Sequence, residues 1–215
     1  PVRATKRLAL KTQPTRQPMS PPDTLLFIRH GATQPNLAGV RCGGDLDVPL
    51  TEVGRQQITL AASDIRQSGF GVDMIVASDL LRTQASAQIL SDALGCVPVV
   101  TLPALRERLL GQWNGQPIDA TETPLRLGMT PPGGEANEVF KARIAQALGE
   151  IFALPCRRPL LVGSKGVARV LRELLGVAAA QSARNGEVIT FHVSGWPPSA
   201  AHAAHTGADR LRSAP

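Results

Sequence analysis

The chain has 215 residues, 43% of them hydrophobic and 19% charged, which is enough for one globular domain with a buried core. Its net charge of +6 does not indicate a broad nucleic-acid-binding surface, because the excess lies near the two ends and residues 23–196 are neutral. We therefore expect a basic disordered extension over residues 1–22, one domain over 23–196, a disordered tail over 197–215 and no nucleic-acid partner.

The cysteines and the apolar runs indicate the cellular compartment in which the protein is expected. Three cysteines this far apart form neither a disulfide framework nor a zinc-binding pattern. No apolar run approaches the ~20 residues that a membrane-spanning helix needs. We expect a cytoplasmic protein without a membrane partner. Its oligomeric state is open, and a dimer is one option.

Strand and helix patterns alternate along the central part of the chain. Short apolar runs predict strands over residues 25–28, 72–77, 97–100, 160–163 and 188–193, and a proline in the third is typical of an edge strand. Helical patterns extend from Thr51 to a turn at 68–71, and over 80–94, 135–154 and 167–175, whereas 101–134 is mostly irregular. The alternation predicts an α/β three-layer sandwich, with a mostly parallel central sheet and helices on both faces.

The first predicted strand runs directly into Arg29, His30 and Gly31. A strand that ends in this way presents polar groups at the carboxyl edge of a sheet, where open α/β folds bind ligands. His30 is the candidate nucleophile and Arg29 its anion-binding neighbour, and Gly31 would let the backbone approach a bound group. Taken alone, the histidine is also consistent with a solvated loop residue.

Two further residues could join such a site, and each has an ordinary alternative. Arg82 lies in the first turn of a helix that Ser78 and Asp79 are expected to cap. There it could hold a phosphate group bidentately, or it could be a surface arginine. Glu107 lies between two arginines, which fits an ionised loop carboxylate, or a general acid if the side chain faces a buried pocket.

Five short motifs occur in a fixed order between residues 24 and 193. They are Arg29-His30-Gly31, Asn36, Gly44-x-x-Asp47-x-Pro49-Leu50-Thr51, Ser78-x-Leu80-x-Arg82-Thr83-x-x-Ser86-Ala87, and Leu105-x-Glu107-x-x-x-Gly111-x-Trp113-x-Gly115. In this order the motifs resemble those of the histidine phosphatase superfamily, in its phosphoglycerate mutase-like branch. That superfamily includes cofactor-dependent phosphoglycerate mutases and many small phosphomonoesterases.

The resemblance implies a role for each motif residue. His30 would be phosphorylated transiently, Arg29 and Arg82 would hold the phosphoryl oxygens, Asn36 would line the pocket, and Glu107 would protonate the leaving group. Clustered cations would stabilise the phosphoryl charge and keep the imidazole neutral near pH 7. The resemblance thus implies a phosphatase acting on a small phosphorylated metabolite.

The resemblance also has implications for the residues around the site. It implies that Arg41, Cys42 and Gly43 form a substrate-facing loop, and it implies neither a metal nor another cofactor. The run from Pro131 to Glu135 is similar to a Gly-Gly-Glu run in several small-molecule phosphatases. These features do not identify the substrate.

One departure from the family pattern concerns the strand predicted over 160–163. The family strand ends in Ser-His-Gly, but here Lys165 stands where the second pocket histidine is expected. An ammonium could bind the phosphate without reproducing imidazole geometry, or it could pair with Glu107. Three functions stay open: an active phosphatase, a degenerate relative that binds a phosphorylated ligand or partner, and a mutase. The short segment 116–134 favours a phosphatase over a mutase, which would need a longer lid.

Overall fold

The structure is a computed structural model that describes residues 22–178 and 182–193. The extension expected over 1–22, apart from Pro22, and the tail expected over 197–215 lie outside the described residues. Within the described part, no helix is long and apolar enough to cross a membrane.

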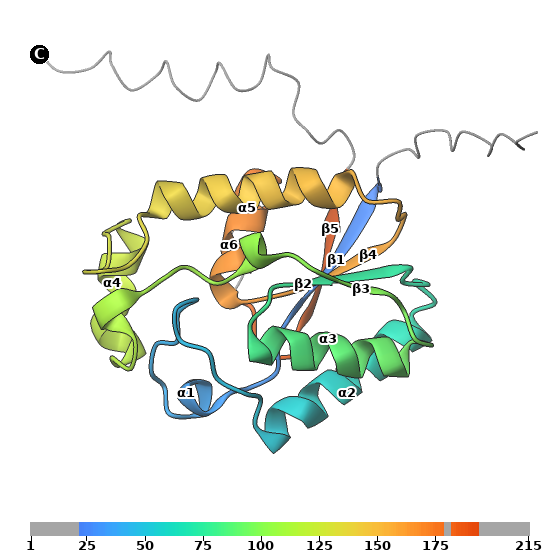
Figure 1. Cartoon of the computed structure of the whole chain (residues 1–215), viewed down its shortest axis with the longest axis horizontal. Helices are drawn as coiled ribbons and strands as arrows, with labels where there is room; N and C mark the ends of the chain where they lie inside the picture. Colours follow the sequence, from blue (N-terminus) through green and yellow to red (C-terminus); the bar gives the residue numbers. More distant parts are fainter. Residues whose placement is uncertain (1–21, 179–181, 194–215) are drawn as a thin grey trace, which may run out of the picture.

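The described residues form one mixed sheet with the strand order β3-β2-β4-β1-β5 (Figure 1). The strands are β1 Thr24–Arg29, β2 Met74–Ala77, β3 Val99–Thr101, β4 Pro159–Gly163 and β5 Val188–His192. β5 runs antiparallel to β1, and the other pairs are parallel. The predicted α/β sandwich is confirmed, and β3 lies at an edge as its neighbouring proline indicates.

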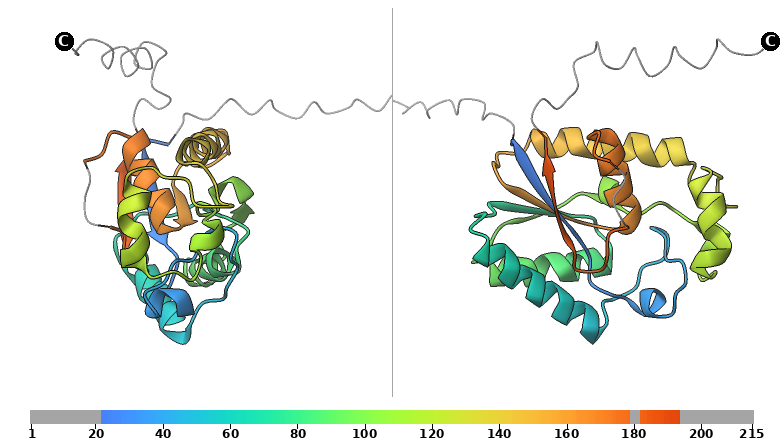
Figure 2. Two further views of the ribbon diagram at one scale, coloured as in Figure 1. Left: turned by 90° about the vertical axis from the view of Figure 1, so that its left-hand side faces the viewer. Right: turned by 180° about the vertical axis from the view of Figure 1, so that it is seen from behind.

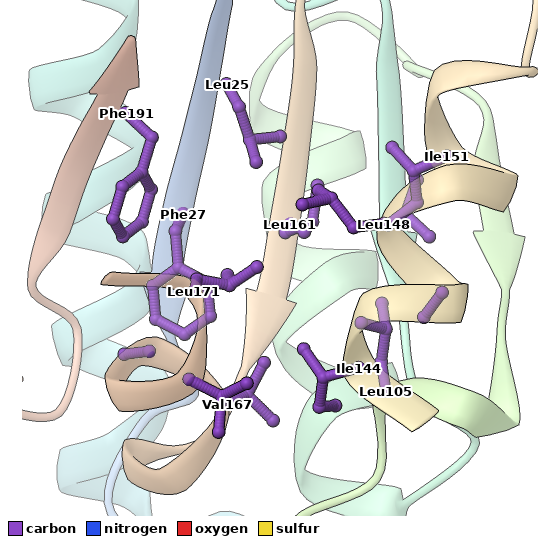
Figure 3. Close-up of a cluster of buried hydrophobic side chains, with 14 of the residues drawn as sticks. Leu25, Phe27, Leu105, Ile144, Leu148, Ile151, Leu161, Val167, Leu171 and Phe191 are labelled. Carbon is purple, nitrogen blue, oxygen red and sulfur yellow. The ribbon is translucent and has the colours of Figure 1, made fainter. Parts of the chain in front are cut away.

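Helices cover both faces of this sheet (Figure 2). They are α2 Glu52–Gln67 and α3 Leu81–Ala93 on one face, and α5 Asn137–Phe152 and α6 Lys165–Leu174 on the other. Because strand side chains alternate, Leu26 and Ile28 of β1 pack in the cluster under α2 and α3, whereas Leu25 and Phe27 pack under α5 and α6 (Figure 3). Two apolar clusters therefore pack against β1 from both sides. Its last residue, Arg29, belongs to the candidate site.

The start of α3 differs from the prediction. The N-cap is Leu80, and neither Ser78 nor Asp79 caps the helix with its side chain. Instead Asp47, from a distant loop, accepts the Leu81 N–H at 2.8 Å, and Asp79 forms a bidentate ion pair with Arg106. A carboxylate brought in by tertiary structure thus takes the capping role that the local sequence assigned to Ser78 and Asp79.

The segment expected to be irregular contains short helices. They are η1 Pro103–Leu105, η2 Gly111–Trp113 and α4 Ile118–Arg126, and a further short helix, α1 Gln34–Leu37, follows β1. The helix α4 was not predicted because Pro124 lies inside it. A long-range contact supports it: the Arg41 guanidinium donates to Thr121 Oγ1 at 2.7 Å and to Ile118 O at 3.1 Å.

Candidate active site

The candidate site lies where β1 and β4 end side by side. The backbone N–H of His30 donates to Gly163 O at 2.9 Å, which joins the residue after β1 to the last residue of β4. The helix α6 starts two residues later, at Lys165. The carboxyl edge of the sheet therefore places Arg29 and His30 next to the start of α6.

Gly31 makes its close approach to another part of the protein rather than to a bound group. A Cβ at Gly31 would overlap the backbone of Gly54 in α2, and a Cβ at Gly54 would overlap the backbone of Ala32. Two facing glycines thus let the chain after β1 lie directly on the first turn of α2. This contact replaces the role that the sequence suggested for Gly31.

His30 is buried, with 3% of its surface exposed, and its ring orientation is fixed by one hydrogen bond. Nδ1 lies 2.8 Å from Gly31 O. A carbonyl oxygen can only accept, so Nδ1 carries the proton of the neutral ring. The lone pair is therefore on Nε2, the nitrogen that can act as a nucleophile.

The electrostatic surroundings favour the neutral imidazole. Burial lowers the pKa of His30 well below its ordinary value, and the positive charges of Arg82 and then Arg29 lower it further. The hydrogen bond to Gly31 acts in the opposite direction but has a smaller effect. The two guanidinium groups, which are 53 residues apart in the sequence, therefore act on the same imidazole.

Each arginine is oriented by backbone carbonyls. Arg82, in the first turn of α3, is 1% exposed and donates to Leu46 O at 2.8 Å and to Gly43 O at 3.0 Å. Arg29 donates from Nη1 to Ala183 O at 2.9 Å, and its buried Nε has no hydrogen-bond partner among the described residues. Arg82 is thus a buried side chain, which excludes the surface-arginine alternative.

Asn36 is held by a residue that the sequence analysis did not identify. Its Oδ1 accepts from Thr33 and from Asn185 Nδ2, and the same Asn185 Nδ2 donates to His30 O at 2.9 Å. Asn185 lies in the turn before β5, outside the motifs that define the site. Only the pairing of β5 with β1 brings it to His30, so no local pattern could have indicated it.

Glu107 is 9% exposed and is fixed by two backbone donors. Oε1 accepts from Arg108 N–H at 2.7 Å, and Oε2 accepts from Gly166 N–H at 2.8 Å. A Cβ at Gly166 would overlap the carboxylate, so the glycine after Lys165 makes room for Glu107. The carboxylate therefore packs on the first turn of α6, within electrostatic reach of Arg29.

Lys165 lines a cavity of about 670 Å³ together with Arg29 and Asn36, whereas His30, Arg82 and Glu107 are not among its lining residues. The opposite wall comes from residues 182–187, and Ile118 of α4 also contributes. The ammonium lies 3.8 Å from a carboxylate oxygen of Glu122, and 38% of the side chain is exposed. The counterion of Lys165 is thus Glu122 of α4, not Glu107 as one expectation from the sequence had it.

This cavity is likewise not lined by Arg41, Cys42 or Gly43, the residues of the expected substrate-facing loop. The buried Arg41 also pairs with Glu122 at 2.7 Å, which ties it to α4. Gly43 holds Arg82 through its carbonyl oxygen, and its N–H donates to Asn114. Burial raises the pKa of Cys42, whose thiol donates to Leu46 O.

The site thus places a buried neutral imidazole within the electrostatic influence of two arginines, at the carboxyl edge of a mixed α/β sheet. Comparison with known families agrees with this description. Residues 25–193 match the histidine phosphatase superfamily (branch 1), and the chain belongs to that superfamily.

Individual relatives include both mutases and phosphatases. A Yersinia pestis protein named "Probable phosphoglycerate mutase GpmB" is 37% identical over 171 residues, which are 71% of this chain and 75% of the relative. A mycobacterial glucosyl-3-phosphoglycerate phosphatase, solved with VO₃, has a TM-score of 0.67 at 31% identity and covers 78% of this chain and 92% of its own. A phosphoglycerate mutase from Thermus thermophilus has a TM-score of 0.64 at 26% identity, over 81% of this chain and 94% of its own.

The influence of Arg82 on His30 can be measured directly. Replacing Arg82→Gln removes a positive charge that lowers the pKa of His30, so this pKa should rise. An NMR titration of the His30 ring, assigned with a His30→Gln variant, measures the change. The control Arg55→Gln removes the same charge from an exposed position on α2 and should leave the titration unchanged. Equal shifts in both variants would show that Arg82 does not act locally on His30.

Proposed function

We propose that the protein hydrolyses phosphomonoesters through a transient phosphohistidine on His30, with a small phosphorylated metabolite as substrate. The observation that carries this proposal is the hydrogen bond from His30 Nδ1 to Gly31 O, which leaves the Nε2 lone pair available. The low pKa of His30 supports it, because the imidazole is then unprotonated near pH 7 and can act as a nucleophile.

The proposed reaction has two displacements at phosphorus. Nε2 of His30 attacks the phosphorus atom and the ester P–O bond breaks, while Glu107 donates a proton to the departing oxygen. Water then attacks the phosphorus atom of the phosphohistidine and gives a proton to the Glu107 carboxylate. The P–N bond breaks, and phosphate is released. The Arg29 and Arg82 guanidinium groups would stabilise the negative charge on the phosphoryl oxygens, and Asn36 and Lys165 would also contact them.

The cavity supports a small polar substrate. At about 670 Å³ it has room for more than a phosphate group, and seven of its eleven lining residues carry a charged or amide side chain. It meets the proposed phosphate site at Arg29, Asn36 and Lys165. We include in the proposal a cytoplasmic location, supported by the three widely spaced cysteines, and the absence of a nucleic-acid partner, supported by the neutral charge of residues 23–196. We also include the absence of a membrane partner, supported by the lack of a long apolar run in the sequence.

Two alternatives are weighed against the proposal. The first alternative is a mutase, which transfers the phosphoryl group to a second acceptor, as the names of some relatives suggest. The short segment that contains α4 favours access of water to a phosphohistidine, and so favours a phosphatase. The replacement of the second pocket histidine by Lys165 is the observation that favours a degenerate member, which would bind a phosphorylated ligand without turnover. Trapping the phosphoenzyme separates that alternative from both enzymes.

Trapping the phosphoenzyme is the direct test of the proposal. Acid-free rapid quenching during turnover of p-nitrophenyl phosphate, followed by peptide mass spectrometry, should place the phosphoryl group on His30. His30→Ala should lower hydrolysis by about a thousandfold or more, because the covalent step is lost. His192→Ala, which changes a histidine at the end of β5, serves as the control and should be active. Unchanged hydrolysis by His30→Ala would reject the proposed nucleophile.

The contribution of Lys165 is tested by two substitutions. Lys165→Met removes the charge at similar length and should lower kcat/KM by about tenfold, because a cation near the phosphoryl oxygens is lost. Lys165→His restores the residue type of the family and should raise turnover. Steady-state kinetics with p-nitrophenyl phosphate measure both effects. A wild-type kcat/KM in Lys165→Met would remove Lys165 from the phosphate site.

A further inference from the structure

The loop that carries Glu107 is bound by an ion pair that the proposed reaction does not use. Arg143 of α5 donates from Nε to Glu135 Oε1 at 3.0 Å and from Nη2 to Glu135 Oε2 at 2.7 Å. The Glu135 side chain is only 7% exposed and that of Arg143 is 24% exposed. A two-point contact with this little exposure fixes both the distance and the orientation of the two groups.

The same guanidinium also donates to main-chain carbonyl groups at and before Glu107. Arg143 Nη1 donates to Ala104 O at 2.7 Å and to Arg106 O at 2.9 Å, and Nη2 lies 3.5 Å from Glu107 O. These acceptors belong to η1 and to the residues that follow it. One side chain therefore determines where the backbone of Glu107 lies.

Glu135 binds the following part of the loop. Its carboxylate accepts from Leu109 N–H at 3.3 Å, its own N–H donates to Leu109 O at 2.9 Å, and its carbonyl oxygen accepts from Arg108 Nε at 2.8 Å. Arg143 thus holds residues 104–107, and Glu135 holds residues 108–109. The loop is tied to the start of α5 through this pair.

The glycines of the Pro131–Glu135 run allow Glu135 to reach the loop. Gly133 has a φ of +70°, and the N–H of Gly134 closes a turn onto Pro131 O at 2.8 Å. A Cβ at Gly134 would lie 2.6 Å from Leu109 O, and a Cβ at Gly111 would overlap the backbone of 132–134. The run therefore packs backbone against backbone, which places Glu135 beside Leu109.

We propose that Glu135 and Arg143 are positioning residues for Glu107. They contact neither the cavity nor His30, and they act by fixing the loop from which Glu107 would protonate the leaving group. This inference rests on the proposed function. A proton donor is effective only when it lies within hydrogen-bond reach of the leaving oxygen, so a small displacement of this loop slows the step that needs the proton.

The dependence on the leaving group separates such a role from a general loss of structure. p-Nitrophenolate leaves readily without a proton. The phenolate released from phenyl phosphate is much more basic, because the pKa of its conjugate acid is about 10, like that of the tyrosine side chain. The two substrates have nearly the same shape. Misplacement of Glu107 should therefore slow phenyl phosphate hydrolysis more than p-nitrophenyl phosphate hydrolysis.

The experiment measures kcat/KM for both substrates in Glu135→Gln, Arg143→Lys and the double variant, because kcat/KM does not include the later attack of water, which is the same for both substrates. Each should lower kcat/KM for phenyl phosphate by about tenfold and kcat/KM for p-nitrophenyl phosphate by less than about threefold. The double variant should be no worse than the more affected single variant, because the two residues act as one unit. Lys141→Gln is the control: it breaks the ion pair of α5 with Glu173 without touching residues 104–109, and both rates should stay at the wild-type level.

A Glu107→Gln variant distinguishes the failure of this inference from the failure of the proposed function. It should show the same preference for the better leaving group, more strongly. Equal losses on both substrates in Glu135→Gln and Arg143→Lys, or no loss on either, would overturn the positioning role. If Glu107→Gln itself showed no dependence on the leaving group, Glu107 would not be the proton donor and the proposed mechanism would be wrong at that step.

Discussion

The hydrogen bond between His30 Nδ1 and the carbonyl of Gly31 is the interaction on which the site depends. It fixes the tautomer, and burial beside Arg29 and Arg82 keeps the ring unprotonated. Without this bond either nitrogen could carry the proton, and the lone pair would have no fixed direction. The positive charges of the arginines would be unchanged, but the attack on phosphorus proposed for Nε2 would lose its fixed direction.

The rest of the fold serves to bring distant segments to this ring. β1 and β4 end together, α3 supplies Arg82, and the loop after η1 supplies Glu107, which rests on the first turn of α6. The loop at residues 43–46 orients Arg82 through two carbonyl oxygens, and the turn before β5 contacts His30 through Asn185. Contacts between backbone and side chain therefore determine the geometry of the charged groups.

The sequence was informative where local patterns decide the structure. Apolar runs identified the strands, and the helical pattern predicted from Thr51 matches α2, where Thr51 is the N-cap and its hydroxyl oxygen accepts a backbone N–H. It was uninformative where the partner is distant in the chain. Four residues act through tertiary contacts of this kind: Asp47 at the start of α3, Arg41 against α4, Asn185 beside His30, and Glu122 beside Lys165. Their residue types alone are compatible with solvated loops, so their contacts can be identified only in the folded structure.

In the proposed reaction, Arg29, His30 and Arg82 surround one phosphoryl group. A crystal structure of the protein with bound vanadate tests it most directly, since vanadate imitates the five-coordinate phosphorus of the transition state. We expect vanadium bonded to Nε2 of His30, with guanidinium nitrogens of Arg29 and Arg82 about 3 Å from the vanadate oxygens. Vanadate bound elsewhere, or bound at His30 without contact to either arginine, would contradict it.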